Sequence, residues 1–453
     1  MNNSGLKPVL GLSAVSFIAI GFMIGGGVFV FTGIALKITG PALPLAYALA
    51  VIPVFISILP MAMLGSAIPT TGGNYKYPCR MFSPGIAFVG IWTYALTSFF
   101  GQIPLLANGC VTYIQSFFPG IPSLPVALGL VTFFYLINLL GVKFAAIIQG
   151  TLVIILITAL LVYGGTGLFK LDPTNFHNIW QKGSGNILLG TALLTFTYLG
   201  ANAIIELGGE IIDPGEIIPK AFMISFPIVA GIYILVGIAT VGMADSEILN
   251  KSKEPLIIVS NIMFKEPGRL FFIFGGAVLA LTTTLNAIFI TGTKSLLVIT
   301  RDNLLPKSLG RISHGFKTPY RALTLFWVLS VLGILSQFSL ETLASYASLG
   351  ALAITIPLQL VALTFSKKYP DYYAAAIFKL KGPWQFICPL AGIFMALFFG
   401  LIILVDLASF YKIGGFILFV LSGAVYFHLR KLYLLGKGID VNKLKDKEDW
   451  QCP

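Results

Sequence analysis

Residues 9–36 read VLGLSAVSFIAIGFMIGGGVFVFTGIAL, an apolar run that is broken near its middle by Gly25, Gly26 and Gly27. The run is long enough to cross a bilayer. Three consecutive glycines weaken a helix interior, because each loses extra backbone freedom on folding. Inside lipid, an opened helix is tolerated only where its main-chain groups face protein or a polar cavity. The glycine run therefore predicts a place where a ligand meets bare backbone within the membrane.

The rest of the chain has the composition of a membrane protein. Of its 453 residues, 57% are hydrophobic and only 10% are charged, whereas a soluble domain has about 25% charged residues. Apolar runs of about 18 or more residues recur, which predicts an all-α membrane protein with twelve transmembrane helices. The predicted spans are residues 9–36, 41–67, 84–117, 123–141, 143–168, 186–207, 219–243, 268–300, 320–339, 343–365, 385–407 and 413–435.

The net charge of +12 comes from Lys and Arg residues whose distribution along the chain indicates a membrane protein rather than a nucleic-acid-binding protein. If the N-terminus lies inside, most of the 29 Lys and Arg residues fall in the predicted cytoplasmic segments. This is the positive-inside bias, and anionic lipid is the expected partner of these charges. We expect an integral, multi-pass protein of the plasma (inner) membrane with both termini in the cytoplasm. The sequence carries no signal for an oligomeric state.

The sequence shows no pattern that indicates an enzyme, a metal site or a cofactor. Its four cysteines form no CxxC pair, and none of its three histidines has a partner four residues away. It contains no GxxxxGK[ST] phosphate loop and no GxSxG or HExxH motif. We therefore expect no catalytic residue, no metal and no cofactor, with proton or Na⁺ coupling left open.

The predicted spans divide into two sets of five and a final pair. We expect one transmembrane domain over residues 1–435 and a short polar cytoplasmic tail over 436–453. Within the domain, repeat one covers about 9–168, repeat two about 186–365, and the extra helices about 385–435. Because five is odd, the second set enters the membrane from the opposite face, which makes the two sets inverted repeats. The sixth span has a second weak point at residues 198–201, and paired interruptions of this kind point to a midplane binding site.

The two interruptions together favour an α-amino acid as the ligand. The half-helix that begins after the glycine run presents free N–H groups to a carboxylate. The half-helices that end near Ile24 and Tyr198 present carbonyl groups to an ammonium group. The predicted substrate-binding residues are Ile24, Gly25, Gly26, Gly27, Phe196, Tyr198, Gly200, Ala201 and Asn202. The alternative interpretation of the glycine run is a close helix–helix contact.

Four further polar residues in the predicted spans are candidates for gating or coupling. Glu206 is a carboxylate at membrane depth, which is costly and marks a functional candidate. The hydroxyl of Thr283 either bonds back to its own helix or helps to complete an oxygen cage for Na⁺. Asn286 lies one turn further on, and Lys294 either snorkels, pairs with an acid or forms a cytoplasmic gate.

At these residues the chain resembles the amino acid–polyamine–organocation superfamily of transporters. Residues 24–29, IGGGVF, are similar to the family pattern IG(S/A)GIF. Residues 198–219 resemble the family's sixth-span glycine break, which is followed by E-x-x-(N/D)-P and I-P. Asn286, Lys294 and residues 301–306, RDNLLP, resemble the eighth-span pattern N…R…ARDGxLP.

The resemblance implies a LeuT-like 5+5 inverted-repeat fold with discontinuous helices 1 and 6, first described in a bacterial leucine transporter. It also implies alternating access and an amino acid permease that binds the substrate carboxylate at the glycine run. The chain departs from the pattern at Ala201, where Phe or Val is usual, and at Lys294, where Arg is usual. Some proton-coupled members carry a fifth-span lysine, whereas this chain has Leu156 there and no lysine between Phe144 and Gly167.

We therefore expect a secondary active amino-acid transporter, either symporter or antiporter, with proton-linked uptake or exchange slightly favoured. The scarcity of charge within the spans favours a neutral or apolar amino acid. A polyamine or other organic-cation transporter of the same fold is the alternative, and it would need Glu206 as an acidic partner. A non-transporting membrane receptor is an alternative of another class, although no loop is long enough to form a docking domain.

Overall fold

The computed structural model describes residues 8–244, 249, 254–313, 315–407, 410–445 and 447–450. In these ranges the chain is helical, and its β-type pairing is limited to two isolated bridges, Leu10 with Ile211 and Thr71 with Leu207. The all-α prediction is therefore confirmed for the part of the chain that the structure describes.

Most of the helices are long α-helices, and several of them pass into short π or 3₁₀ segments. The α-helices are α1 (Leu12–Gly26), α2 (Thr32–Thr39), α3 (Leu43–Ala67), α4 (Gly73–Met81), α5 (Pro84–Leu96), α6 (Ile103–Gln115), α7 (Ser123–Leu139), α8 (Val142–Lys170), α9 (Ser184–Leu199), α10 (Pro214–Met243), α12 (Pro255–Met263), α13 (Glu266–Phe271), α14 (Leu279–Arg301), α15 (Tyr320–Leu335), α16 (Leu340–Lys368), α17 (Pro370–Ala375), α18 (Trp384–Asp406) and α19 (Phe410–Leu435). The π segments are η1 (Gly27–Phe31), η3 (Thr97–Gln102) and η6 (Phe272–Val278). The 3₁₀ segments are η2 (Gly40–Ala42), η4 (Pro173–Phe176), η5 (Gly200–Glu206), η7 (Lys307–Gly310) and η8 (Val441–Leu444).

Nine helical segments of the described residues are long and apolar enough to cross a membrane, so the chain is an integral multi-pass membrane protein. The first of them, Leu12–Ala67, contains the two predicted spans 9–36 and 41–67. Gly40 divides these two spans, since its φ of +59° ends α2 in a conformation that favours glycine. The predicted spans 123–141 and 320–339 form the shorter apolar helices α7 and α15.

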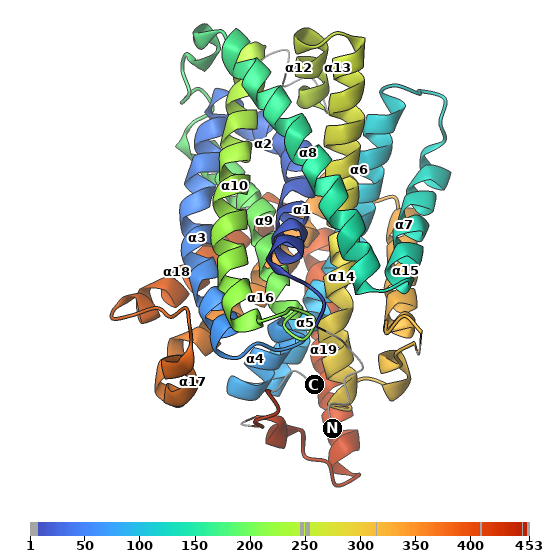
Figure 1. The fold of residues 1–453 in the computed structure, drawn as a ribbon, viewed down its shortest axis with the longest axis vertical. Coiled ribbons are helices and arrows are strands. Elements are labelled where there is room, and N and C mark those ends of the chain that lie inside the picture. Colours follow the sequence, from blue (N-terminus) through green and yellow to red (C-terminus); the bar gives the residue numbers. More distant parts are fainter. Residues whose placement is uncertain are drawn as a thin grey trace.

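The helix α1 occupies the middle of the bundle (Figure 1). It packs against α8, α10, α14 and the segment η5. The last two long helices lie outside this core, with α18 packed on α3 and α16 and α19 packed on α5. An apolar helix that is surrounded by other helices can tolerate irregular backbone, because neighbouring side chains can satisfy its main-chain groups.

The short helix α4 lies at the end of the molecule opposite α12 and α13 (Figure 1). Its residues lie between the predicted spans 41–67 and 84–117. A completely buried arginine anchors this helix, because Arg80 donates to both carboxylate oxygens of Asp302 at 2.8 Å. Arg80 also donates to the carboxylate of Asp449 in the C-terminal tail, at 2.9 and 3.1 Å. This network joins α4, the end of α14 and the tail.

Candidate substrate-binding site

A narrow cavity lies between α1 and η5, where the two predicted interruptions meet. Four predicted binding residues line it, namely Gly27, Phe196, Gly200 and Asn202. Its volume is about 30 Å³, whereas pockets that hold small ligands have roughly 300–1,000 Å³. In this conformation the cavity is too small for an amino acid, so admission of a substrate requires the surrounding helices to move.

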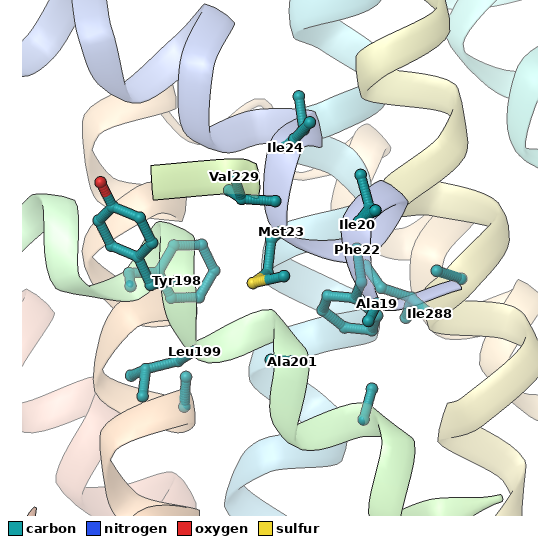
Figure 2. Packing of buried hydrophobic residues seen from close by; sticks show 14 of the residues in the cluster. Ala19, Ile20, Phe22, Met23, Ile24, Tyr198, Leu199, Ala201, Val229 and Ile288 are labelled. Atoms are coloured by element: carbon teal, nitrogen blue, oxygen red, sulfur yellow. The ribbon is translucent and has the colours of Figure 1, made fainter. Parts of the chain in front are cut away.

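Four other predicted binding residues, namely Ile24, Gly25, Tyr198 and Ala201, do not line the cavity. Ile24, Tyr198 and Ala201 are buried in the same apolar cluster, and Figure 2 shows them around Met23. Gly25 is also buried. Gly26 is the last residue of α1, and its surroundings lie outside the described part of the structure.

The α-helix ends at the predicted first interruption, but the backbone does not open there. After Gly26 the chain continues as the π-helix η1, and the N–H of Gly27 donates to the carbonyl of Ile24. The carbonyl of Ile24, predicted to be free, therefore has a donor in this conformation. Single-turn π segments are often found at functional sites.

The glycines of this interruption allow close contact between helices. A Cβ atom at Gly25 would lie 1.5 Å from Oγ1 of Thr284 on α14. A Cβ atom at Gly27 would lie 2.2 Å from the hydroxyl oxygen of Tyr233 on α10. Gly25 thus has the helix-contact role of the alternative interpretation, whereas Gly27 both contacts α10 and lines the cavity.

Three tyrosines supply hydrogen-bond donors to the carbonyl groups around the first interruption. The hydroxyl of Tyr113 donates to the carbonyl of Phe29 at 2.9 Å, and that of Tyr47 donates to the carbonyl of Gly27 at 3.3 Å. The hydroxyl of Tyr233 donates to the carbonyl of Met23. These bonds explain how an irregular helix survives in an apolar bundle. Sequence reasoning missed all three tyrosines, and their only signal was a hydroxyl within an apolar span.

At the second interruption the α-helix α9 gives way to the 3₁₀-helix η5. The N–H of Gly200 donates to the carbonyl of Tyr198, so this carbonyl also has a donor. A Cβ atom at Gly200 would lie 2.6 Å from Cδ1 and 3.0 Å from the carbonyl oxygen of Phe22 on α1. Because Gly200 has no side chain, the second interruption can pack directly against the backbone of α1 at Phe22, just before the first interruption.

An aromatic pair and several uncharged polar side chains complete the cavity lining. The rings of Phe31 and Phe196 stack with their centroids 5.0 Å apart. The Oδ1 atoms of Asn74 and Asn202 are buried, and neither accepts a hydrogen bond from the described residues. Gln102 also lines the cavity, and no Asp, Glu, Lys or Arg of the described chain does. Sequence reasoning missed Asn74, although Gly72 and Gly73 before it signal an irregular turn.

Glu206 lies behind the cavity lining rather than in it. Its carboxylate accepts hydrogen bonds from the main-chain N–H of Asn74 at 3.0 Å and from the hydroxyl of Ser295 at 2.8 and 2.9 Å. Lys294, the residue before Ser295, forms an ion pair with a different acid, Glu210, in which Nζ lies 2.7 Å from Oε2. Of the three possibilities for Lys294, the structure therefore shows the ion pair.

The polar residues of α14 bond mainly to neighbouring backbone and amide groups. The hydroxyl of Thr283 donates to the carbonyl of its own helix at Ala280, at 2.8 Å, and more weakly to that of Gly21, at 3.4 Å. The adjacent Thr284 donates to Gly21 at 2.7 Å and lines the cavity. Asn286 lies away from the cavity, where it joins α14 to α7 and α8 through Asn138 and Gln149.

The described residues contain no cluster of His, Cys, Asp and Glu that could hold a metal ion. Three described cysteines, Cys79, Cys110 and Cys388, are free thiols. Cys452 and His314 lie outside the described residues.

Comparison with known proteins yields matches over nearly the whole chain. The profile of a family described as amino acid permease matches residues 10–440. The branched-chain amino acid permease BcaP of Bacillus subtilis is 26% identical, over 94% of this chain and 93% of its own. The methylthioribose transporter of the same organism is 24% identical, over 96% of each chain. The low-affinity putrescine importer PlaP of Escherichia coli is 26% identical, over 77% of this chain and 78% of its own.

Proposed function

Because the chain belongs to the amino acid permease family, we propose that it is a secondary active transporter that moves an α-amino acid across the membrane by alternating access. The observation that carries this proposal is the cavity between Gly27 and Gly200. Both glycines lie where an α-helix changes to another helix type, and both pack closely against a neighbouring helix. Such a junction can present main-chain groups to a zwitterion once the helices separate.

We further propose the topology that transport requires. Twelve spans, two inverted repeats over about 9–168 and 186–365, and cytoplasmic termini agree with the positive-inside bias of the sequence. A transporter in the plasma membrane with this topology would open the cavity to each face in turn. The small cavity volume supports an assignment of this conformation to a closed stage of the cycle.

The proposed substrate is a neutral amino acid with an apolar side chain. The described cavity lining has no charged side chain that would pair with an acidic or basic substrate. The aromatic rings of Phe31 and Phe196 offer an apolar surface, while the unpartnered Oδ1 atoms of Asn74 and Asn202 offer acceptors to N–H groups. The relative named as a branched-chain amino acid permease supports the same choice.

A polyamine or another organic cation is the second candidate. The relative named as a putrescine importer favours it, and the buried carboxylate of Glu206 contacts Asn74 of the cavity lining. A polyamine has two cationic ends and no carboxylate, so it would need acidic groups in the lining itself. The uncharged lining therefore favours the amino acid.

Transport by the purified protein in liposomes tests these proposals. We expect saturable uptake of labelled leucine that depends on an imposed gradient or on unlabelled leucine inside the vesicles. Isoleucine and valine should compete, whereas putrescine and methylthioribose should not. Competition by putrescine without competition by isoleucine would favour the organic-cation transporter. Leucine binding with access from one face alone, and without flux, would favour a non-transporting receptor.

A further inference from the structure

Glu206 is a deeply buried carboxylate with no cationic partner among the described residues. Its side chain is almost fully buried, with 3% of the residue exposed. The groups that contact its carboxylate are neutral, namely the main-chain N–H of Asn74 and the hydroxyl of Ser295. An ionised carboxylate in such a place is costly without a paired cation. Binding a proton removes that cost, while the hydrogen bonds and the N-terminus of α4 stabilise the ionised form.

The described cations of α4 and α10, and Lys294 of α14, contact groups other than Glu206. On α4, Lys76 donates to the main-chain oxygen of Asp449, and Arg80 pairs with Asp302 and Asp449. On α14, Lys294 pairs with Glu210 at 2.7 Å, and on α10, Lys220 pairs with Glu216. The helix α1 has no titratable side chain. The remaining titratable groups on the elements packed against η5 are Arg301, exposed at the end of α14, the thiol of Cys79 and several tyrosines. The tyrosines are Tyr75 and Tyr77 on α4, Tyr47 on α3, Tyr198 on α9 and Tyr233 on α10, and Tyr94 on α5 also faces Glu206.

A single residue separates this carboxylate from the candidate substrate cavity. Asn74 lines the cavity, and its main-chain N–H donates a hydrogen bond to Glu206 at 3.0 Å. An amide side chain has both a donor and an acceptor. It can donate to an ionised carboxylate through Nδ2 or accept from a protonated one through Oδ1, and Oδ1 of Asn74 has no donor here. Asn74 is therefore able to contact substrate on one side and either form of Glu206 on the other.

The same carboxylate holds together three elements that must move if the cavity opens at this end. It bonds to α4 through Asn74 and to α14 through Ser295. Two glycines bring α4 close enough: Gly72 has a φ of +71° and donates its N–H to the main-chain oxygen of Glu206 at 3.0 Å. A Cβ atom at Gly73 would lie 2.5 Å from the main-chain oxygen of Ile205. A carboxyl group that gains a proton accepts fewer hydrogen bonds, so protonation loosens this junction.

From this geometry we infer that Glu206 binds and releases the coupling proton of the transport cycle, an inference that rests on the proposed function. On one face of the membrane a proton from water forms an O–H bond with a carboxylate oxygen of Glu206. On the other face that bond breaks and the proton returns to water. One proton thus crosses with each zwitterionic amino acid, and one net positive charge moves per substrate.

Two transport modes in liposomes separate coupling from substrate movement. The first is accumulation of labelled leucine that is driven by an alkaline vesicle interior. The second is exchange of labelled for unlabelled leucine with no gradient. We expect Glu206→Gln to lose gradient-driven accumulation almost completely and to keep exchange within about threefold of the unmodified protein. The matched control is Glu216→Gln, because Glu216 is exposed and pairs only with a lysine one turn away. It should retain both modes.

A pH profile distinguishes a proton carrier from a structural residue. Ser295→Ala removes a donor to the carboxylate, so the carboxylate should hold its proton up to a higher pH. We expect the profile of gradient-driven transport to move toward alkaline pH by half a unit or more. A residue with only a packing role would lower the rate without moving the profile.

Infrared difference spectroscopy can detect protonation of the Glu206 carboxyl group in the absence of substrate. A pH titration of the purified protein should show the C=O stretch of a protonated carboxyl, and Glu206→Gln should lack that band. If the band appears but no amino acid or amine is transported, the proposed function fails and the proton site stands. Absence of the band, undiminished gradient-driven accumulation in Glu206→Gln, or equal loss of both modes in that variant would each overturn the inference.

Discussion

Lys294 on α14 and Glu210 beyond η5 form an ion pair of 2.7 Å in which both side chains are at least 95% buried. The main-chain oxygen of Glu210 also accepts hydrogen bonds from the N–H groups of Val9 and Leu10, at 2.9 and 2.8 Å. Through Glu210, the segment before α1 is thus joined to α14 and to the end of η5. This ion pair and the hydrogen bond from Ser295 to Glu206 therefore both connect α14 to η5 and the residues that follow it.

Breaking the Lys294–Glu210 pair from one side should be strongly destabilising. Lys294→Met leaves Glu210 buried and unpaired, which costs roughly 3–5 kcal/mol. Replacement of both residues by Met removes both charges, so the double variant should be more stable than Lys294→Met alone. Thermal unfolding in detergent measures the coupling free energy as a double-mutant cycle. Additive effects of the two single changes would contradict a direct interaction.

Added methyl groups at the first interruption should disturb helix contact and transport together. Gly25→Ala places a Cβ atom 1.5 Å from Oγ1 of Thr284, so α1 and α14 must separate. Overpacking of this kind costs about 1–3 kcal/mol. We expect a lower unfolding temperature and at least a tenfold loss of leucine uptake. Gly231→Ala on α10 is the matched control, because its Cβ atom would meet nothing within 4 Å. Wild-type uptake by Gly25→Ala would refute this account.

The tyrosine hydroxyl groups should stabilise the irregular part of α1 and η1. Tyr233→Phe keeps the ring but removes the donor to the carbonyl of Met23. A buried acceptor left without its partner costs about 1–3 kcal/mol. We expect a lower unfolding temperature and faster amide hydrogen exchange across residues 23–31. Unchanged exchange in this segment would show that the hydroxyl does not stabilise it.

The contact of the tail with α4 should make stability depend on pH. Partial burial opposes ionisation of Asp449, but the hydrogen bonds and charge of Arg80 outweigh it and hold the pKa of that carboxyl below its usual range. A carboxyl group of lowered pKa stabilises the fold above its unfolded pKa, about 3.9, and loses that contribution as the pH falls through its folded pKa. The contribution is reduced by solvent screening, because the side chain is 35% exposed.

The difference in unfolding temperature between the unmodified protein and Asp449→Asn tests this pH dependence. We expect the difference to be largest near neutral pH and to shrink as the pH falls below about 4. Glu448→Gln, at the exposed neighbouring position, should show no such difference. A gap between Asp449→Asn and the unmodified protein that persists at low pH would indicate that the contact does not depend on the charge of Asp449.

The sequence by itself determined that the chain is helical, that it belongs in a membrane, and where two of its helices change type. These properties are local: apolar runs decide which segments enter lipid, and the glycines at 25–27 and 200 weaken a helix wherever they lie. The family followed from the same motifs, and the match over residues 10–440 confirms it.

Only the tertiary structure decided the conformation and the contacts of the two helix interruptions. It keeps the chain helical through the first interruption, because the hydroxyls of Tyr47, Tyr113 and Tyr233 reach carbonyl groups far away in sequence. It also brings Asn74, 132 residues away, to Glu206, and Lys294 to Glu210. The partner of a buried polar group is selected by the packing of whole helices, and a local sequence pattern holds no information on that packing.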